Sequence, residues 1–180
     1  MKLRSLIALC ALLMAALPVR AASDYLLVLE GVLGESDDKK YQGAIDLQSF
    51  SLGVSATIGT TAGGGTTAGK ATFSDLVVTK KLDKSSPFLF LHCAQGKHIP
   101  TATLILRKAG DRPVEYFVVK LTDVIITSVQ TSGGVGGDVP QEQLSLNYAK
   151  IEYIYTPQKA DGSADTPVNT GWDIKANVKL

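Results

Sequence analysis

Short segments rich in Val, Ile, Thr, Tyr and Phe alternate along the chain with clusters of Gly, Pro, Asp and Ser. This alternation of strand-forming and turn-forming residues is typical of an all-β protein. We therefore predict an antiparallel β-barrel or sandwich with one short helix. The expected strands cover residues 24–32, 43–56, 72–80, 101–108, 114–130, 142–156 and 171–180.

The apolar positions change parity inside segment 43–56, from 45 and 47 to 50, 52, 54 and 56. Successive side chains of a strand point to opposite faces, so both sets reach one core only if an extra residue is inserted. The pattern predicts a β-bulge near Gln48-Ser49. Segment 114–130 alternates more regularly, and the residues expected on one of its faces are Phe117, Val119, Leu121, Ile125 and Val129.

The sequence SSPFLFLHCAQG, residues 85–96, is the single helix candidate. Ser86 is expected as its N-cap, Pro87 as the first helical residue and Gly96 as its end. The body is apolar almost all round, because its consecutive Phe and Leu residues point in directions about 100° apart. A helix of this kind is covered on more than one side, by its own barrel and by a neighbouring subunit.

The N-terminus has the pattern of a secretory signal peptide. Lys2 and Arg4 precede an apolar run over residues 6–17, and Pro18 follows, before the small-x-small sequence Val19-Arg20-Ala21. We expect a signal peptide over residues 1–21, cleavage between Ala21 and Ala22, and one domain over residues 22–180. The run is too short to span a bilayer, so no transmembrane anchor is expected. Translation from Met14 is the alternative, and would leave a plain N-terminal tail.

Charge and cysteine content narrow the function. The chain has 180 residues with 18 Lys and Arg against 17 Asp and Glu, and losing residues 1–21 would leave 15 basic residues and a net charge of −2. No block of like charge stands out, which argues against nucleic acid or an anionic membrane as partner. Of the two cysteines only Cys93 would remain, so no disulfide within the chain is expected.

Three motifs superficially suggest chemistry. Gly64, Gly69 and Lys70 have P-loop spacing, but Ala71 replaces the required hydroxyl and a strand follows. His92, Cys93 and His98 are close together, yet the first two diverge on a helix and no second ligand cluster exists. Ser85 and Ser86 lack the elbow that would make either a nucleophile beside His92 and Asp83. We therefore expect no catalytic, cofactor or metal site, and not an enzyme.

Several longer motifs carry a family resemblance. In order they are DKSSP (83–87), GKH (96–98), RKAG (107–110), YTPQKADGS (155–163) and GWDIKAN (171–177). With the strands around them they resemble the Hcp (haemolysin-coregulated protein) family, the tube proteins of bacterial type VI secretion, over about residues 23–178. The resemblance implies a β-barrel with a lateral helix, assembled as a hexameric ring around a wide lumen. It also implies stacking of rings into a secreted tube that is tipped by a spike protein, propelled by a contractile sheath and able to carry small effectors.

The resemblance assigns roles to two segments. The glycine-rich loop 59–70 is expected to contact the adjoining ring, through Gly59, Gly63, Gly64, Gly65, Gly69 and Lys70. The helix is expected at the subunit interface, through Phe88, Leu89, Leu91 and His92. A second glycine-rich loop covers residues 131–140, and such loops are either disordered or ordered by a partner.

The signal peptide departs from the family pattern, because a tube protein assembles in the cytoplasm and leaves without a cleaved signal. One possibility is that translation starts at Met14 and the protein assembles in the cytoplasm. The other is an exported relative that acts as a periplasmic or extracellular ring scaffold or as a secreted effector. We expect a secreted, extracellular protein, with passage through the periplasm if the signal peptide is used and assembly in the cytoplasm if translation starts at Met14.

Overall fold

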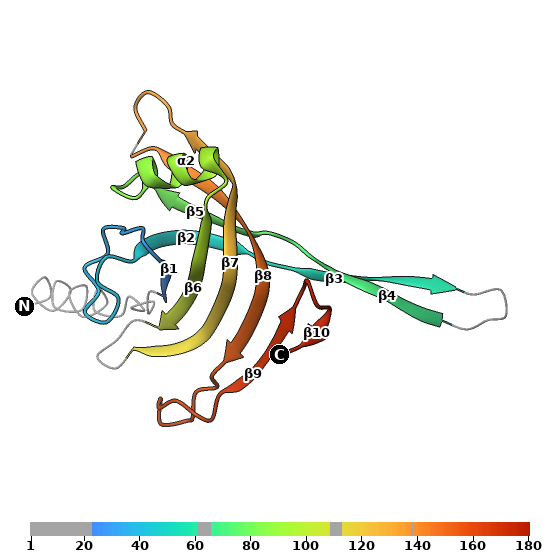
Figure 1. Ribbon diagram of the computed structural model, residues 1–180. Helices are drawn as coiled ribbons and strands as arrows, with labels where there is room; N and C mark the ends of the chain where they lie inside the picture. The colour runs from blue at the N-terminus through green and yellow to red at the C-terminus, as the bar shows by residue number, and fades with distance from the viewer. Residues whose placement is uncertain (1–22, 61–65, 109–112, 138) are drawn as a thin grey trace, which may run out of the picture.

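The computed structural model describes residues 23–60, 66–108, 113–137 and 139–180. Its main element is a closed antiparallel barrel, in agreement with the predicted fold class (Figure 1). The barrel closes because β8 pairs with both β5 and β7, giving the order β8-β5-β2-β1-β6-β7 and back to β8. The barrel strands are β1 (Ser23–Leu29), β2 (Ile45–Ser51), β5 (Leu76–Lys81), β6 (His98–Lys108), β7 (Val114–Ser132) and β8 (Gln141–Tyr155).

Two hairpins lie outside the barrel. β9 (Val168–Asp173) and β10 (Val178–Lys179) extend the sheet from the second half of β8. β3 (Val54–Thr60) and β4 (Thr66–Phe73) pair only with each other and form an arm that projects far from the barrel (Figure 1). Three predicted segments are therefore each divided between two strands. Segments 43–56 and 72–80 are divided where the chain leaves the barrel for the arm and returns from it, and segment 171–180 is divided by the turn between β9 and β10.

The core fills the barrel with aliphatic side chains from every barrel strand. Burying such side chains is the main favourable contribution to folding, at about 1.5–3 kcal/mol for each large one. The side chains with no measurable exposure include Leu27, Ile45, Leu76, Leu104, Val119 and Leu144.

The predicted β-bulge is confirmed at the expected place. Leu47 pairs with Lys80 and Ser49 with Thr79, so Gln48 is the extra residue on β2. The bulge lets Leu47 on one side and Phe50 on the other both pack against the same core.

The predicted face of β7 is only partly correct. Phe117, Val119 and Leu121 are buried, but beyond them Val124 and Ile126 are buried in place of Ile125. Val129 packs against the core as predicted, partly buried, because a register irregularity between Ile126 and Ser128 returns it to the inner face. Asp123 lies between the two sets with a φ of 56°, in the left-handed region. This backbone conformation reverses the side-chain alternation, which the apolar pattern alone does not reveal.

The one helix in the described residues is α2 (Ser86–Gln95), which ends at Gly96 in the left-handed conformation as predicted. The predicted N-cap is wrong by one residue, since Ser85 is the N-cap and makes no side-chain capping hydrogen bond. The hydroxyl of Ser86 is buried instead, where it accepts a hydrogen bond from Lys80 and donates one to Glu142.

Candidate assembly surfaces

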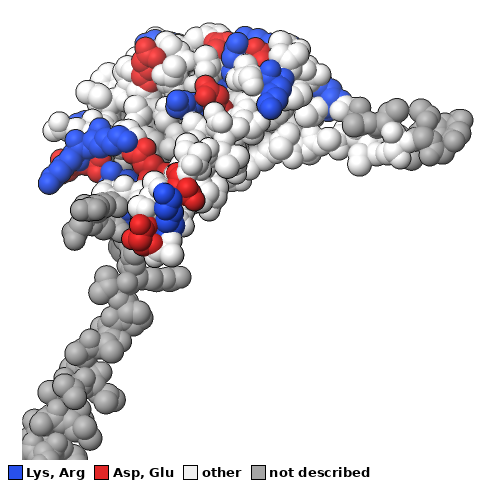
Figure 2. Space-filling model, turned by 90° about the horizontal axis from the view of Figure 1, so that it is seen from below, with Lys and Arg blue, Asp and Glu red and all other residues white. Residues whose placement is uncertain are grey.

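The arm has one apolar face and almost no charge. Val54, Ala56 and Ile58 share a face of β3, and their register places Ala71 and Phe73 of β4 on that face. Val54 and Ile58 are 63% and 68% exposed. Lys70 is the only charged residue in the two strands, and the arm is nearly all white in Figure 2, whereas both signs of charge are mixed over the barrel.

The prediction of a loop over residues 59–70 is therefore mostly wrong. Gly59 belongs to β3, and Gly69 and Lys70 belong to β4, where a register irregularity opposite Ala56–Ile58 keeps the apolar residues on one side. Gly63, Gly64 and Gly65 lie outside the described residues. A two-stranded hairpin is marginally stable by itself in water, so a face of this kind needs a partner surface.

A small apolar groove lies where the arm joins the barrel. Its volume is about 280 Å³ and its lining includes Leu52, Phe73, Ile151 and Tyr153. Hydrogen bonds hold this junction: the Gly53 amide donates to Ser74 Oγ at 2.8 Å and the Ser74 amide donates to the Gly53 carbonyl at 2.9 Å. The Tyr148 hydroxyl donates to the Ser74 carbonyl, and burial raises the pKa of Tyr148 to about 12.

α2 presents a second exposed apolar face. Phe88, Phe90 and Leu91 are 55%, 67% and 48% exposed. Leu89 and His92 point the other way and are buried within their own chain. Of the four residues predicted at the subunit interface, Phe88 and Leu91 are therefore exposed, whereas Leu89 and His92 are covered by their own chain.

A buried ionic network fixes the start of α2 on the barrel. Lys80 Nζ has no exposure and lies 2.8 Å from Glu142 Oε2, 2.8 Å from Asp83 Oδ1 and 3.0 Å from Ser86 Oγ. All three ammonium hydrogens thus have acceptors. The Ser86 hydroxyl donates to Oε2 of Glu142, and the Thr131 hydroxyl donates to Oε1 of Glu142 at 3.1 Å. One lysine therefore joins β5, β8 and the first turn of α2.

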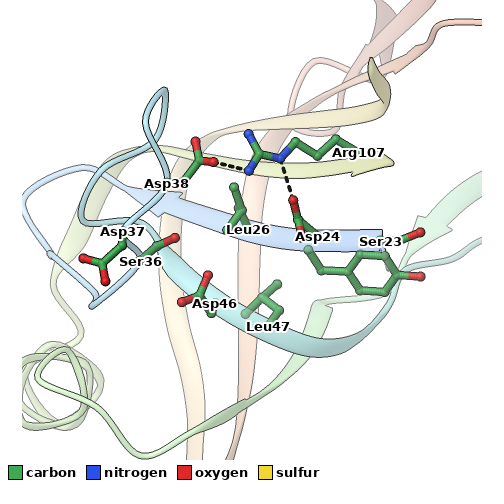
Figure 3. A pocket seen from close by; sticks show the side chains of 10 residues that line it. Ser23, Asp24, Leu26, Ser36, Asp37, Asp38, Asp46, Leu47 and Arg107 are labelled. Atoms are coloured by element: carbon green, nitrogen blue, oxygen red, sulfur yellow. Dashed lines mark hydrogen bonds and ion pairs between the residues drawn. The ribbon is translucent and has the colours of Figure 1, made fainter. Parts of the chain in front are cut away.

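A second buried cation stabilises the opposite part of the barrel. Arg107 of β6 extends between Asp24 of β1 and Asp38 of the β1–β2 loop (Figure 3). The Arg107 hydrogen bond is the main cause that lowers the pKa of Asp38 to about 2, with the amides of Lys40 and Tyr41 adding to it. The adjoining pocket of about 360 Å³ also holds Asp37 and Asp46.

The residues that superficially suggested chemistry do not converge. The Ser85 hydroxyl donates to Asp83 at 2.5 Å, while His92 lies against Lys97 and His98 against Asp123. Within the described ranges no group of three or more His, Cys, Asp or Glu side chains is placed to hold a metal ion. No helix in the same part of the chain has the length and apolar character to cross a membrane.

Comparison with known proteins identifies the family. Residues 25–155 match the family described as type VI secretion system effector, Hcp. The chain belongs to the Hcp family of type VI secretion. Protein hcp1 of Pseudomonas aeruginosa is 46% identical over 160 residues, which span 88% of this chain and 99% of that protein.

Solved structures support the same conclusion. A structure described as a type six secretion system protein has a TM-score of 0.84 at 33% identity, covering 88% of this chain and all of that one. Hcp1 from Salmonella typhimurium has a TM-score of 0.74 at 32% identity, covering 88% and 99%. This Hcp protein thus belongs to a family of secreted, structural components of type VI secretion.

Sequence reasoning missed the two buried cations of this Hcp protein, Lys80 under the start of α2 and Arg107 on β6. Lys80 and Arg107 look like ordinary alternating polar residues of a strand, and their partners are 62 and 83 residues away in the chain. Phe90 was also missed, although the helical pattern places it about 100° around α2 from Leu89, away from the buried side. The strands of the arm were hidden by their glycine and threonine content.

Removal of Lys80 tests the network. Lys80→Met leaves Glu142 and Asp83 without their buried cation, and we expect a loss of about 3–5 kcal/mol in the free energy of unfolding, measured with urea. Lys84→Met, at an exposed lysine four residues later, is the control and should change stability by less than about 0.5 kcal/mol. Equal effects of the two substitutions would contradict the role of the network.

The Asp38–Arg107 pair predicts a dependence of stability on acid. The pKa of Asp38 is about 2 in the folded chain against an ordinary 3.8, so its contribution is complete above 3.8 and lost as the pH falls toward 2. Arg107→Gln should cost about 2 kcal/mol near neutral pH and flatten this part of the stability curve. Lys39→Gln removes a neighbouring positive charge as a control. Urea unfolding between about pH 5 and 2.5 measures both, and an unchanged acid profile in Arg107→Gln would refute the assignment.

Proposed function

We propose that this Hcp protein is the subunit of a hexameric ring that stacks into the secreted tube of a type VI secretion machine. The observation that carries the proposal is the presence of two exposed apolar faces, on α2 and on the arm, in a chain of this family. The two elements lie in different parts of the molecule (Figure 1). Different surfaces that meet between copies give head-to-tail contacts, which close into rings or continue as filaments. A tube of stacked rings needs one contact that closes each ring and a second contact that continues from ring to ring.

In this proposal α2 forms the contact within the ring and the arm forms the contact between rings. Two aromatic side chains and a leucine are exposed on α2, and large apolar side chains of this kind are enriched at the centre of protein interfaces. The arm reaches well beyond the barrel, and its face of Val54, Ala56 and Ile58 is exposed among the residues that the structure describes. A spike protein, a contractile sheath and small effectors in the lumen are the partners of such a tube.

The alternative, an exported ring scaffold or secreted effector, depends on residues 1–21 alone. These residues lie outside those that the structure describes, and the family match begins at residue 25. Cleavage between Ala21 and Ala22 remains a prediction from the sequence, as does passage through the periplasm.

The ring contact is tested by placing a charge on the outward face of α2. Phe90→Asp should weaken ring assembly at least tenfold, because an unpaired carboxylate would be buried in the apolar contact. Leu33→Asp is a matched control, since Leu33 and Phe90 are both 67% exposed. Sedimentation velocity over a range of concentrations reads out the assembly. A hexamer of unchanged affinity in Phe90→Asp would contradict the proposed contact.

The stacking contact is tested on the arm. Ile58→Asp should leave single rings intact and abolish their association into tubes at high protein concentration, as seen by electron microscopy. Ser55→Asp places the same charge on the opposite face of β3 and should stack as the wild type does. Tubes formed equally well by Ile58→Asp would exclude the apolar face of the arm from stacking.

A further inference from the structure

α2 packs against the barrel through a narrow strip of buried side chains, Ser86, Leu89 and His92, which we call its inward seam. In the body of the helix only Leu89 and His92 are fully buried, together with Ser86 at its first turn, and Cys93 is half-buried. The remaining side chains of α2 are exposed. The Lys80 network holds the beginning of the helix, so His92 is the buried anchor nearest its end.

His92 is an unusual anchor, because one of its ring nitrogens has no partner. The side chain is 6% exposed, and Nε2 lies 3.1 Å from the Nζ of Lys97, two residues after the helix. An ammonium group only donates hydrogen bonds, so Nε2 is the acceptor and the neutral ring carries its proton on Nδ1. Among the described residues, Nδ1 of His92 is the single buried side-chain nitrogen or oxygen without a hydrogen-bond partner.

In the part of the chain that the structure describes, the acidic groups around α2 are already paired with other cations. On β7, against which α2 packs, Glu115 is paired with Lys40, and Asp123 is paired with His98 and Lys175. At the other end of the helix, Asp83 and Glu142 are held by Lys80. The charged group that faces His92 is therefore the cation of Lys97.

We propose that His92 is a proton-sensitive anchor, and that its protonation releases α2 from the barrel. A proton on Nε2 converts the acceptor of the Lys97 hydrogen bond into a donor that faces another donor. It also places two positive charges about 3 Å apart at a part-buried contact, where the buried imidazole is less well screened than it would be in water. Undocking of the helix exposes the His92 ring to solvent and removes this repulsion.

The direction of the pH dependence follows from the same contacts. Burial, with a further contribution from Lys97, lowers the pKa of His92 below its ordinary value of 6.5. The undocked helix therefore binds a proton at a higher pH than the docked helix does. Docking is fully favoured above about pH 6.5 and weakens as the pH falls from there toward the lower pKa of the docked state.

Release of α2 has a consequence for assembly that rests on the proposed ring contact. The outward face of Phe88, Phe90 and Leu91 keeps its position only while the inward face holds the helix on the barrel. Mild acid would then separate the subunits of a ring without unfolding the barrel. The protein would thus be a tube subunit whose rings come apart in an acidified compartment.

Hydrogen exchange of the full-length protein tests the anchor. In the wild type, protection of the α2 amides, corrected for intrinsic exchange, should fall by up to about tenfold per pH unit between pH 6.5 and 5.5, the limit for one linked proton. His92→Gln should remove this dependence, and His98→Gln, which changes the only other histidine of the chain, should retain it. Protection in the wild type that does not change with pH, or a dependence lost in His98→Gln, would overturn the proposal.

Two further measurements keep the test decisive. Lys97→Met should raise the pKa of His92, followed by NMR, and reduce the pH dependence of α2, which separates the anchor from general instability of His92→Gln. Sedimentation of the wild type at pH 7.5 and 5.5 reports on the ring. If the α2 amides respond to pH while the hexamer does not, the anchor is correct and the ring contact through α2 is wrong.

Discussion

The pairing of β7 with β8 is the constraint on which the rest of the fold depends. The two strands are hydrogen-bonded from Phe117 and Tyr155 at one end to Ser132 and Gln141 at the other. β8 also pairs with β5 along its first half and with β9 along its second half, so this one strand closes the barrel and extends the sheet. Non-local pairings of this length need a large apolar core to offset the entropy of closing the loops between them.

Both assembly surfaces are positioned by this closed barrel, through quite different interactions. α2 is held by the buried charges of Lys80, Asp83 and Glu142, which demand specific geometry because unpaired charge in the interior costs several kcal/mol. The arm is held at its root by backbone hydrogen bonds between Gly53 and Ser74. The helix is consequently fixed at one end, while the arm has a fixed root and a face that only another surface can cover.

The sequence predicted the features that depend on local periodicity and missed those that depend on distant partners. The all-β strand pattern, the bulge at Gln48 and the end of α2 at Gly96 follow from alternation, parity and glycine, each readable within about ten residues, whereas the barrel was implied by the family resemblance. The left-handed residue Asp123 and the buried lysine of β5 do not, because their roles are set by neighbours on other strands. The arm was mistaken for a loop, since glycine and threonine at residues 59–70 suggest flexibility when the partner strand is not considered.

The difference between local periodicity and distant partners also explains why the sequence predicted the position of α2 but not which of its residues face the barrel. An apolar helix with no polar side predicts cover on two sides, but it does not tell which residues face which side. The structure resolves this by burying Leu89 and His92 together, so that an ionisable group shares the inward seam with an aliphatic one. A purely aliphatic seam would hold α2 equally at every pH. The presence of a histidine there, beside a lysine and without an acceptor for Nδ1, makes the position of the outward face conditional on the proton concentration.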